Sequence, residues 1–233
     1  MAWNECSPWP EYAPLLANIA LNDLDHALER GRGYLTYTRY LDDMVVLTPN
    51  SQKGREWADR ALERIRREAE AIGVSLNAEK TRTVTMTERG ANFAFLGFEF
   101  RWERSPKTGK WYAHTSPRKK KVTEVLSRVR DTLRDCRALP IRAAVERVNG
   151  IVRGWVNYFR VGNSGQAFGK VKQYVERKVR RFVAKRAGRK GLGWKRWSRE
   201  VVYGAWGLHG DYRVRYYNPS KASVQPNGII TLV

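Results

Sequence analysis

Apolar residues recur at a regular interval in two stretches near the start of the chain. From residue 13 to 31, and again from 52 to 72, they follow one another every three or four positions, and Gly31 and Gly73 close the two stretches. This interval is that of an amphipathic helix, and glycine is a common residue at a helix end. The pattern therefore predicts two helices, over 13–31 and 52–72, with Ser51 as N-cap of the second.

Between and beyond these helices, apolar residues alternate with polar ones, which is typical of strands. The runs "YLTYTRYL" and "MVVLT" are separated only by Asp42 and Asp43, so the sequence predicts a hairpin with these two aspartates as its loop. Further short strands are expected at "VSL", "TRTVTMT", "NFAFLGFEFRW" and "KWYAHT". Helix, hairpin, helix and strands together indicate an α+β unit with a largely antiparallel sheet.

The second half of the chain contains helical patterns, followed by an irregular tail. Three apolar series with helical spacing lie within 122–133, 141–159 and 168–183. The short connections between them predict a three-helix bundle. The tail from residue 201 is aromatic and irregular, and we expect its last ten residues to be loose.

Charge distinguishes the same two halves of the chain. Residues 1–116 contain 16 Lys and Arg and 16 Asp and Glu, whereas residues 117–197 contain 24 basic and only 5 acidic residues. The net charge of +21 is thus concentrated on the predicted bundle. A compact segment with this charge attracts a polyanion, and nucleic acid is the usual one. A solvated basic surface or a contact with an anionic membrane surface is the alternative explanation.

Composition argues against several other classes of protein. No stretch approaches the roughly 18 apolar residues that a membrane span needs, and the first residues lack the pattern of a signal peptide. Cys6 and Cys136 are isolated from each other, which excludes a cysteine zinc site and argues against a disulfide framework. We therefore expect a protein of the reducing cytoplasm, without a membrane partner.

The consecutive aspartates Asp42 and Asp43 admit two explanations. As a hairpin loop they would be unusual, because the favoured two-residue loops carry glycine at a central position. Two like charges side by side without a glycine cost on the order of 1 kcal/mol or more. A divalent cation would offset this repulsion, and carboxylate oxygens are ligands that suit Mg²⁺. The pattern alone leaves both a simple turn and a metal site open.

Five segments of the chain are more informative together than any one of them is alone. In chain order they are "APLLANIALNDLDHAL" (13–28), "RYLDDMVVL" (39–47), "GVSLNAEKTRTV" (73–84), "FAFLGFEF" (93–100) and "RVNGIVRGWVNYFRVG" (147–162). The second resembles the Y-x-D-D hairpin of reverse transcriptases, and the fourth is similar to their primer-grip strand. The others resemble motifs of group II intron-encoded reverse transcriptases/maturases, the last one in the thumb, or domain X. Over residues 13–162 the chain therefore resembles this family.

The resemblance implies a specific domain organisation. Residues 13–114 would form a partial polymerase palm, an antiparallel sheet with two helices. Residues 115–200 would form a basic three-helix thumb/maturase bundle, and residues 201–233 an aromatic C-terminal tail. Residues 1–12 match no motif of the family.

The resemblance also implies RNA-directed DNA polymerase chemistry, a nucleotidyl transfer from a dNTP that depends on Mg²⁺. Asp42 and Asp43 match two of the three carboxylate ligands of the metal, and Lys80 matches a lysine near the departing phosphates. The residues that match the primer grip are Phe95, Leu96 and Gly97.

The chain departs from the family pattern in its first residues. The third carboxylate and the fingers would precede residue 13, and nothing there resembles them. Where the family has P-Q-G-G-x-x-S-P-L-L, this chain has "CSPWPEYAPLL". We therefore expect that the chain does not polymerise alone, and that a second chain would have to supply the fingers.

The resemblance and the charge of the bundle imply structured RNA, a group II intron, as partner, with an RNA/DNA hybrid as a further one. Basic side chains of the bundle are expected to contact phosphates, and Tyr158 is expected to stack on a base. The residues assigned to RNA binding are Arg153, Tyr158, Arg160, Lys170, Lys172, Arg177, Lys178, Arg180, Arg181, Lys185 and Arg186.

Three functions stay open from the sequence. The chain takes part in DNA synthesis on RNA, or it clamps intron RNA as a non-catalytic splicing cofactor, or it is a decayed remnant without polymerase activity. A DNA-endonuclease module with clustered His and Cys is not expected, because His26, His114 and His209 are far apart in the sequence.

Overall fold

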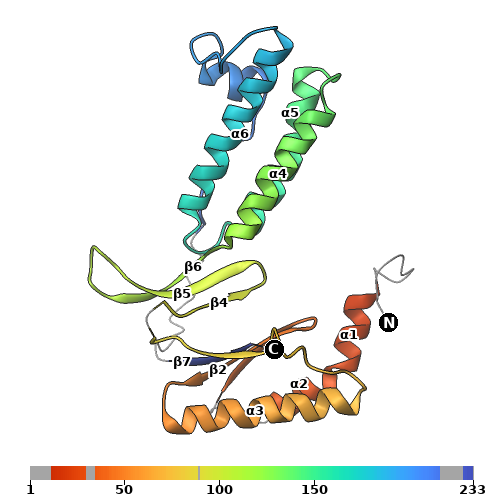
Figure 1. Ribbon diagram of the computed structural model, residues 1–233, viewed down its shortest axis with the longest axis vertical. Coiled ribbons are helices and arrows are strands. Elements are labelled where there is room, and N and C mark those ends of the chain that lie inside the picture. Colours follow the sequence, from red (N-terminus) through yellow and green to blue (C-terminus); the bar gives the residue numbers. More distant parts are fainter. Residues whose placement is uncertain (1–11, 30–34, 89, 216–227, 233) are drawn as a thin grey trace. The chain divides into compact units, whose positions relative to one another are not determined.

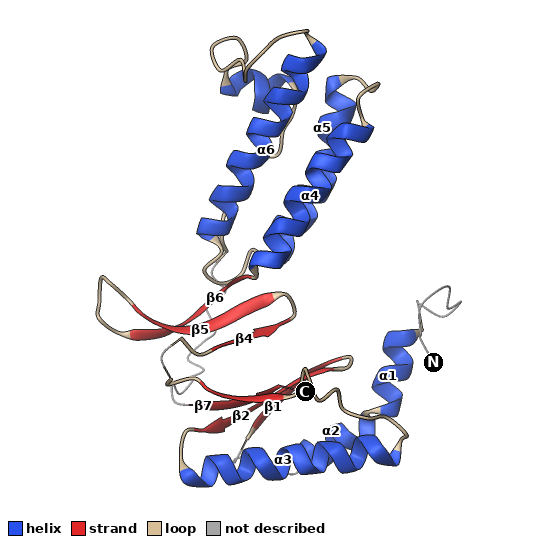
Figure 2. Cartoon of the chain, in the orientation of Figure 1, coloured by secondary structure: helices blue, strands red, loops and turns tan. Residues whose placement is uncertain are grey.

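The computed structural model describes residues 12–29, 35–88, 90–215 and 228–232 of the chain (Figure 1). Helices and strands are both present, and the larger sheet is antiparallel, which confirms the predicted α+β class (Figure 2). The chain divides into two compact units. Unit 1 comprises Met1–Leu96, Arg101–Ala113 and Ser223–Val233, and unit 2 comprises Gly97–Phe100 and His114–Ala222.

The helices of unit 1 follow the predicted pattern with one difference. The first predicted helix is divided at Leu21 into α1 (Ala13–Ala20) and α2 (Asn22–Glu29). The second, α3, extends over Gln52–Ala71. Ser51 caps α3 by accepting a hydrogen bond from a backbone amide of the first turn at 3.0 Å, so the predicted N-cap is confirmed.

Four strands form the larger sheet of unit 1. In chain order they are β1 (Thr36–Tyr40), β2 (Asp43–Pro49), β3 (Arg82–Thr85) and β7 (Gly228–Leu232). Their spatial order is β1-β2-β7-β3, and β7 is antiparallel to both of its neighbours. A strand from the C-terminal end of the chain therefore lies inside the sheet. The expectation that the last ten residues are loose is wrong for Gly228–Leu232, because the sheet pairs them on both sides.

The strand β7 is buried in the way that a central strand requires. Ile229, Ile230, Thr231 and Leu232 are each at most 8% exposed, although neighbouring residues of a strand point to opposite faces of its sheet. Both faces of β7 are therefore covered.

A compact apolar cluster joins this sheet to the helices of unit 1. Ile65 of α3 and Val46 of β2 are completely buried in it, and Leu24 and Leu28 of α2 are also covered. Figure 1 shows α2 and α3 on the same side of the sheet. The apolar stripe predicted within 52–72 is therefore the face that α3 turns toward the strands.

The remaining strands form a second sheet in the order β4-β5-β6. β4 (Asn92–Phe95) and β5 (Phe98–Arg104) are joined by Leu96 and Gly97 only, and β6 covers Trp111–Pro117. Leu96 and Gly97 have φ values of 49° and 78°, the two positive values of a type I′ turn. The expected single strand "NFAFLGFEFRW" is therefore a hairpin, because this pair reverses the chain. The expected strand at "VSL" is not formed.

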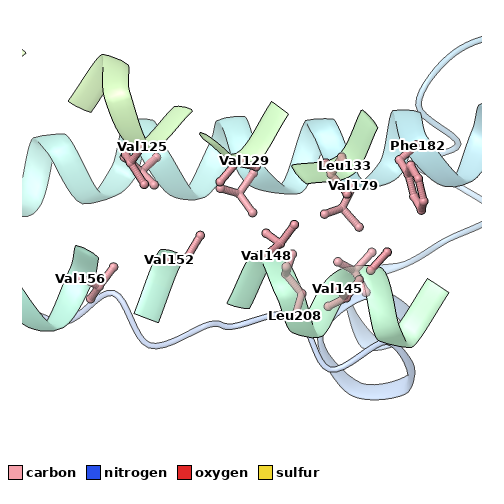
Figure 3. Packing of buried hydrophobic residues seen from close by; sticks show 14 of the residues in the cluster. Val125, Val129, Leu133, Val145, Val148, Val152, Val156, Val179, Phe182 and Leu208 are labelled. Carbon is pink, nitrogen blue, oxygen red and sulfur yellow. The ribbon is translucent and has the colours of Figure 1, made fainter. Parts of the chain in front are cut away.

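Unit 2 is a bundle of three long helices, as predicted. They are α4 (Lys119–Asp135), α5 (Ile141–Tyr158) and α6 (Gly165–Arg186), which run up, down and up in Figure 1. Of the 18 buried residues in their common core, 11 are valines. Figure 3 shows how valines of the three helices approach one another. Since valine lowers helix propensity slightly, these helices depend on their mutual packing more than on local preference.

The segment after α6 packs back onto the bundle. It contains a short π-helix, η1 (Glu200–Ala205), and its side chains Val202 and Leu208 are buried in the common core. The Asn149 side chain of α5 holds this segment by donating to the Gly207 carbonyl and accepting from the His209 amide, each at 2.8 Å. Residues 200–214 are therefore an integral layer of unit 2.

None of the helices that the structure describes combines the length and the apolar character needed to cross a membrane.

Candidate functional site

The hairpin that carries the two aspartates turns one residue earlier than predicted. Tyr40 pairs with Asp43, so Leu41 and Asp42 form the two-residue loop. Leu41 has a φ of 57°, a left-handed value that bulky residues rarely adopt. A positive φ at the first loop residue alone is the pattern of a type II′ turn, where glycine is usual. Such strain costs about 1–3 kcal/mol and tends to occur at functional sites.

Both aspartates of the hairpin are available to solvent. Asp42 and Asp43 are exposed, and within the described residues neither carboxylate has a hydrogen-bond or ion-pair partner. The next three residues of β2, Met44, Val45 and Val46, are each at most 5% exposed. Within the described residues, two unpaired carboxylates therefore lie at the start of β2, directly before its buried residues. Their negative charge is available to a cation.

Arg39 of β1 connects this turn to the first helices. Its guanidinium is bound to the Asp25 carboxylate through Nε, at 2.8 Å, and through Nη2. Its Nη1 donates to the Asn18 side chain and to the Leu41 carbonyl, both at 3.0 Å. Tyr37 donates a further hydrogen bond to Asp25 at 2.9 Å. We call Asn18, Asp25, Tyr37 and Arg39 the Arg39 network.

The charges within the Arg39 network stabilise one another. Hydrogen bonding from Arg39 lowers the pKa of the Asp25 carboxyl, and the same contact raises the pKa of Arg39. Burial, together with the bond to Asp25, raises the pKa of the Tyr37 hydroxyl. At neutral pH the network therefore consists of a carboxylate, a guanidinium and a neutral phenol.

Lys80 lies at the same end of the sheet as Asp43. Val45 of β2 and Arg82 of β3 both pair with Leu232 of β7, so they are level with each other. Asp43 and Lys80 each precede these residues by two positions, and the two strands run in the same direction. Two strand spacings correspond to about 10 Å. The fold therefore brings this lysine and the carboxylates to the same end of the sheet, and the width of β7 separates them.

The turn that presents Lys80 is ordered by Asn77. The Asn77 side-chain oxygen accepts from the amides of Glu79 and Lys80 at 3.0 and 3.2 Å, and its carbonyl accepts from the Thr81 amide at 2.9 Å. The Lys80 side chain itself is exposed. Asn77 thus fixes the backbone and leaves the ammonium group free to meet an anion.

The donor atoms at the hairpin fit a hard cation such as Mg²⁺, which is often held by one or two carboxylates together with water and substrate phosphates. No group of three or more His, Cys, Asp or Glu side chains suited to a metal occurs in the described part of the chain. The neighbour of β2 on the inner side is β7, whose sequence GIITL contains no such side chain. Within the described residues, the hairpin therefore presents two carboxylates with no third His, Cys, Asp or Glu side chain grouped with them.

The predicted primer-grip residues form the β4–β5 turn. Phe95 ends β4, and Leu96 and Gly97 make the reversal. The Gly97 carbonyl accepts a hydrogen bond from the Arg118 amide at 3.0 Å. A Cβ at Gly97 would lie 3.5 Å from the Phe159 ring, which is close contact without a clash. Within unit 2, Gly97 is therefore anchored to the start of α4 and the end of α5.

An exposed aromatic side chain lies beside this turn in unit 2. Tyr158 is 54% exposed, and its ring stacks on Phe98 with 5.8 Å between centroids and 24° between planes. Phe159, which is buried, meets Phe98 edge-on at 4.9 Å. One side of the Tyr158 ring is thus held by Phe98, while about half of the residue's surface is exposed.

Four basic residues of α6 form one continuous line, which we call the cationic stripe. Lys170, Arg177, Arg181 and Lys185 are exposed, and their spacings of seven, four and four residues place them on one helix face. That face is opposite the buried side of α6. None of the four forms an ion pair with any described residue. Over 15 residues the stripe extends about 22 Å along the helix.

Two arginines of the predicted RNA-binding set are buried instead of exposed. Arg180 is 1% exposed, binds Glu176 with 3.0 Å between Nη2 and Oε1, and lies over the Trp194 ring at 4.2 Å. Arg160 is 8% exposed and pairs with Asp211 at 2.9 Å. A buried charge without a partner would be strongly destabilising. We therefore assign both arginines to the interior of unit 2 and not to a phosphate-binding surface.

The acidic partners of these arginines are part of wider networks. Tyr203 donates to Glu176 at 3.1 Å, and burial followed by the Glu176 charge raises the pKa of Tyr203 to about 12. The hydrogen bond from Arg160 lowers the pKa of the Asp211 carboxyl. Because Glu176 is the one acidic residue of α6, its pairing with Arg180 leaves the cationic stripe without an internal counter-charge.

The remaining residues of the predicted set have weaker partners. The Lys172 ammonium lies 5.6 and 5.8 Å from two tyrosine ring centres, and Lys178 lies 5.1 Å from that of Tyr174. Arg153 pairs with Glu146 at 3.5 Å, and Arg186 donates to the Leu139 carbonyl. Exposed pairs of this kind contribute little to stability, so these side chains can exchange their partners for a phosphate.

Sequence reasoning missed the Arg39 network, since nothing in the spacing of Asp25 and Arg39 brings them together before the fold is known. The pairing of Glu176 with Arg180 could have been found, because a glutamate four residues before an arginine on a helix is a recognised favourable pair.

Two family models match the chain. The reverse transcriptase (RNA-dependent DNA polymerase) model matches residues 11–100, and the model of the group II intron maturase-specific domain matches residues 122–201. The first range contains the Asp42–Asp43 hairpin and Lys80, and the second contains the cationic stripe. A search among curated proteins found no match.

Proposed function

The chain belongs to the family of group II intron reverse transcriptases/maturases, and from this premise we propose that its primary function is to bind structured intron RNA through unit 2. The cationic stripe of α6 is the observation that carries the proposal. Its four exposed cations lack ion-pair partners among the described residues, and they belong to a segment with 24 basic and 5 acidic residues. In family terms unit 2 is the thumb, or maturase domain, and unit 1 is a partial palm.

Binding by unit 2 depends mainly on the RNA backbone. Side chains spaced along one straight helix face meet phosphates, and each neutralised phosphate releases condensed counterions. The narrow major groove of an RNA helix hides its base edges, so recognition of structured RNA depends largely on shape and backbone contacts. Tyr158 adds a stacking surface for an unpaired base at a loop or a strand end. We propose that this binding assists folding of the intron for splicing.

The RNA-binding function can be tested by neutralising the stripe in the full chain. We expect a folded group II intron transcript to bind on the order of a hundredfold more weakly when four phosphate contacts are lost. The variant carries Lys170→Gln, Arg177→Gln, Arg181→Gln and Lys185→Gln. The matched control neutralises four exposed cations of unit 1, with Arg55→Gln, Arg60→Gln, Lys107→Gln and Lys110→Gln. Equal losses in the two variants would mean that binding follows net charge and not the stripe.

The hairpin supports a second candidate function, nucleotidyl transfer. Asp42 and Asp43 are unpaired among the described residues. Asp42 lies in the strained turn, Asp43 directly follows it, and Lys80 lies at the same end of the sheet. We propose that the two carboxylates hold Mg²⁺, which when bound would stabilise charge on the primer hydroxyl and the dNTP phosphates. Lys80 would orient the departing phosphates by its charge, and the protein would act by positioning. A third carboxylate would come from residues outside the described sheet or from a second chain.

Primer extension on an RNA template tests the second function. The Asp42→Asn/Asp43→Asn pair preserves the shape of the turn and removes both charges. Mg²⁺-dependent synthesis that disappears in this variant would support the metal assignment. Synthesis that persists unchanged would contradict it. If the unmodified chain makes no product, RNA binding without chemistry stays as the function.

A further inference from the structure

The strained turn at Leu41 is held by a side chain that approaches it from the preceding strand. The Leu41 carbonyl accepts a hydrogen bond from Arg39 Nη1 at 3.0 Å, and Leu41 is the residue with a φ of 57°. We propose that Arg39 is a positioning residue that fixes the Leu41–Asp42 turn and so orients the carboxylates of Asp42 and Asp43. The inference rests on the proposed metal-binding role of this hairpin and deepens it.

The guanidinium is bound on every side. Asp25 engages Nε and Nη2, and Nη1 is shared between the Asn18 side chain and the Leu41 carbonyl. The Arg39 side chain is 8% exposed, so the guanidinium is bound mainly by protein groups and little by water. A planar fork with fixed donor directions makes all of these contacts at once, which a lysine ammonium at the same place cannot do. Through Arg39, the Leu41 carbonyl of the turn is thus linked to side chains of α1 and α2.

Asp25 has a second effect, which concerns charge. An arginine one residue before the end of β1 is close enough in sequence to pair with the aspartates of the loop. In the structure Asp25 takes this arginine instead, and within the described residues Asp42 and Asp43 have no ion-pair partner. The network therefore uses Arg39 to hold the backbone of the turn while Asp25 neutralises its positive charge. Both effects favour a bound cation.

The proposal is tested first by a measurement that requires no metal. A residue with positive φ shows a strong intraresidue NOE between its amide and α protons, which can be followed in full-length protein labelled with ¹⁵N-leucine. We expect this NOE at Leu41 in the unmodified chain. We expect Arg39→Lys to reduce it and to accelerate amide exchange of the turn at least tenfold. Tyr37→Phe is the matched control, because it removes a hydrogen bond to Asp25 and leaves the contact of Arg39 with Leu41. An Arg39→Lys protein with an unchanged NOE and unchanged exchange would overturn the proposal.

A second pair of variants separates positioning from a general loss of stability. Leu41→Gly removes the steric cost of the positive φ, so the effect of Arg39→Lys on exchange of the turn should fall to less than threefold in this background. If Arg39 supported only the overall fold of unit 1, its replacement would accelerate exchange equally in both backgrounds, and the proposal would fail.

The consequence for the cation is measured by Mn²⁺, which broadens the NMR signals of nearby amides. We expect broadening at Asp42 and Asp43 in the unmodified chain, and at least threefold weaker Mn²⁺ affinity with Arg39→Lys. Asp25→Asn should weaken it too, since it frees the positive charge of Arg39. Broadening that is absent in the unmodified chain would refute the metal site of the proposed function, whereas the leucine NOE would still decide whether Arg39 fixes the turn.

Discussion

The two units of this chain differ in how their cores are assembled from the sequence. The core of unit 2 comes from three consecutive helices and the segment that follows them, which the chain supplies in order between residues 119 and 214. The larger sheet of unit 1 takes three strands from residues 36–85, and one of its two inner strands, β7, from 228–232. Unit 2 can therefore form by local steps, whereas unit 1 has to wait for a distant segment.

This difference has a physical consequence for folding and stability. Contacts that are distant in sequence carry a loop-closure cost before they stabilise anything, so they form late and slow the process. Without β7, the inner edges of β2 and β3 would be left unpaired, and such edges invite aggregation. The fold of unit 1 thus depends on a strand that is distant in sequence, whereas the core of unit 2 forms from consecutive segments.

The largest effect is expected from Ile229→Asp, which would break unit 1 alone. Ile229 is 1% exposed in the middle of the sheet, and an unpaired charge there costs about 4–5 kcal/mol or more. Hydrogen exchange read by mass spectrometry should show lost protection in β2 and β3 and unchanged protection in α4–α6. Ile229→Val, at about 0.5–1.5 kcal/mol, is the control. Protection that persists in β2 and β3 would mean that the sheet does not depend on β7.

A comparable but smaller effect in unit 2 should follow from Glu176→Leu. The substitution leaves the Arg180 charge buried without its carboxylate, which costs about 3–5 kcal/mol. Thermal unfolding of the helical signal should shift to lower temperature, while exchange in the sheet of unit 1 stays the same. Replacing both residues, with Glu176→Leu and Arg180→Leu, should recover part of the loss. A double variant no more stable than the single one would show that the unpaired Arg180 charge is not the cause of the loss.

The smallest expected effect is the decrease in the stability of each unit at acid pH. Asp25 in unit 1 and Asp211 in unit 2 both have lowered pKa values because an arginine binds them. Each therefore stabilises the folded state fully above the unfolded pKa of about 3.9, and this contribution is lost as the pH falls through the lower folded value. Asp25→Asn should reduce the acid sensitivity of unit 1 and leave that of unit 2. An acid transition of unit 1 that the substitution does not alter would contradict this assignment.

The same difference between the units explains what the sequence could predict. The three helices of unit 2 were predicted because their apolar residues recur at helical spacing along the sequence. The valines of α4, α5 and α6 are examples. The segment "GIITL" was assigned to a loose tail, because its place between β2 and β3 depends on partners more than 140 residues away. No local rule gives such a pairing.

The candidate site shows the same limit. The sequence predicted the position of the Asp42–Asp43 hairpin, but not that Leu41 would carry the strain of its loop. The sequence also could not distinguish the exposed Arg181 from the buried Arg180. Both are arginines of one helix, and they differ only in the helix face that they occupy. Burial decides this, and burial is a property of the assembled core.

We propose that unit 2 binds structured RNA through the cationic stripe, independently of the hairpin in unit 1. The most direct test is the slope of log K against log salt for a folded intron transcript, with K the association constant. Neutralising the stripe should make this slope shallower by about 3, since each lost phosphate contact contributes about 0.7–0.9. The Asp42→Asn/Asp43→Asn variant should keep the full slope. An unchanged slope in the stripe variant would contradict the account.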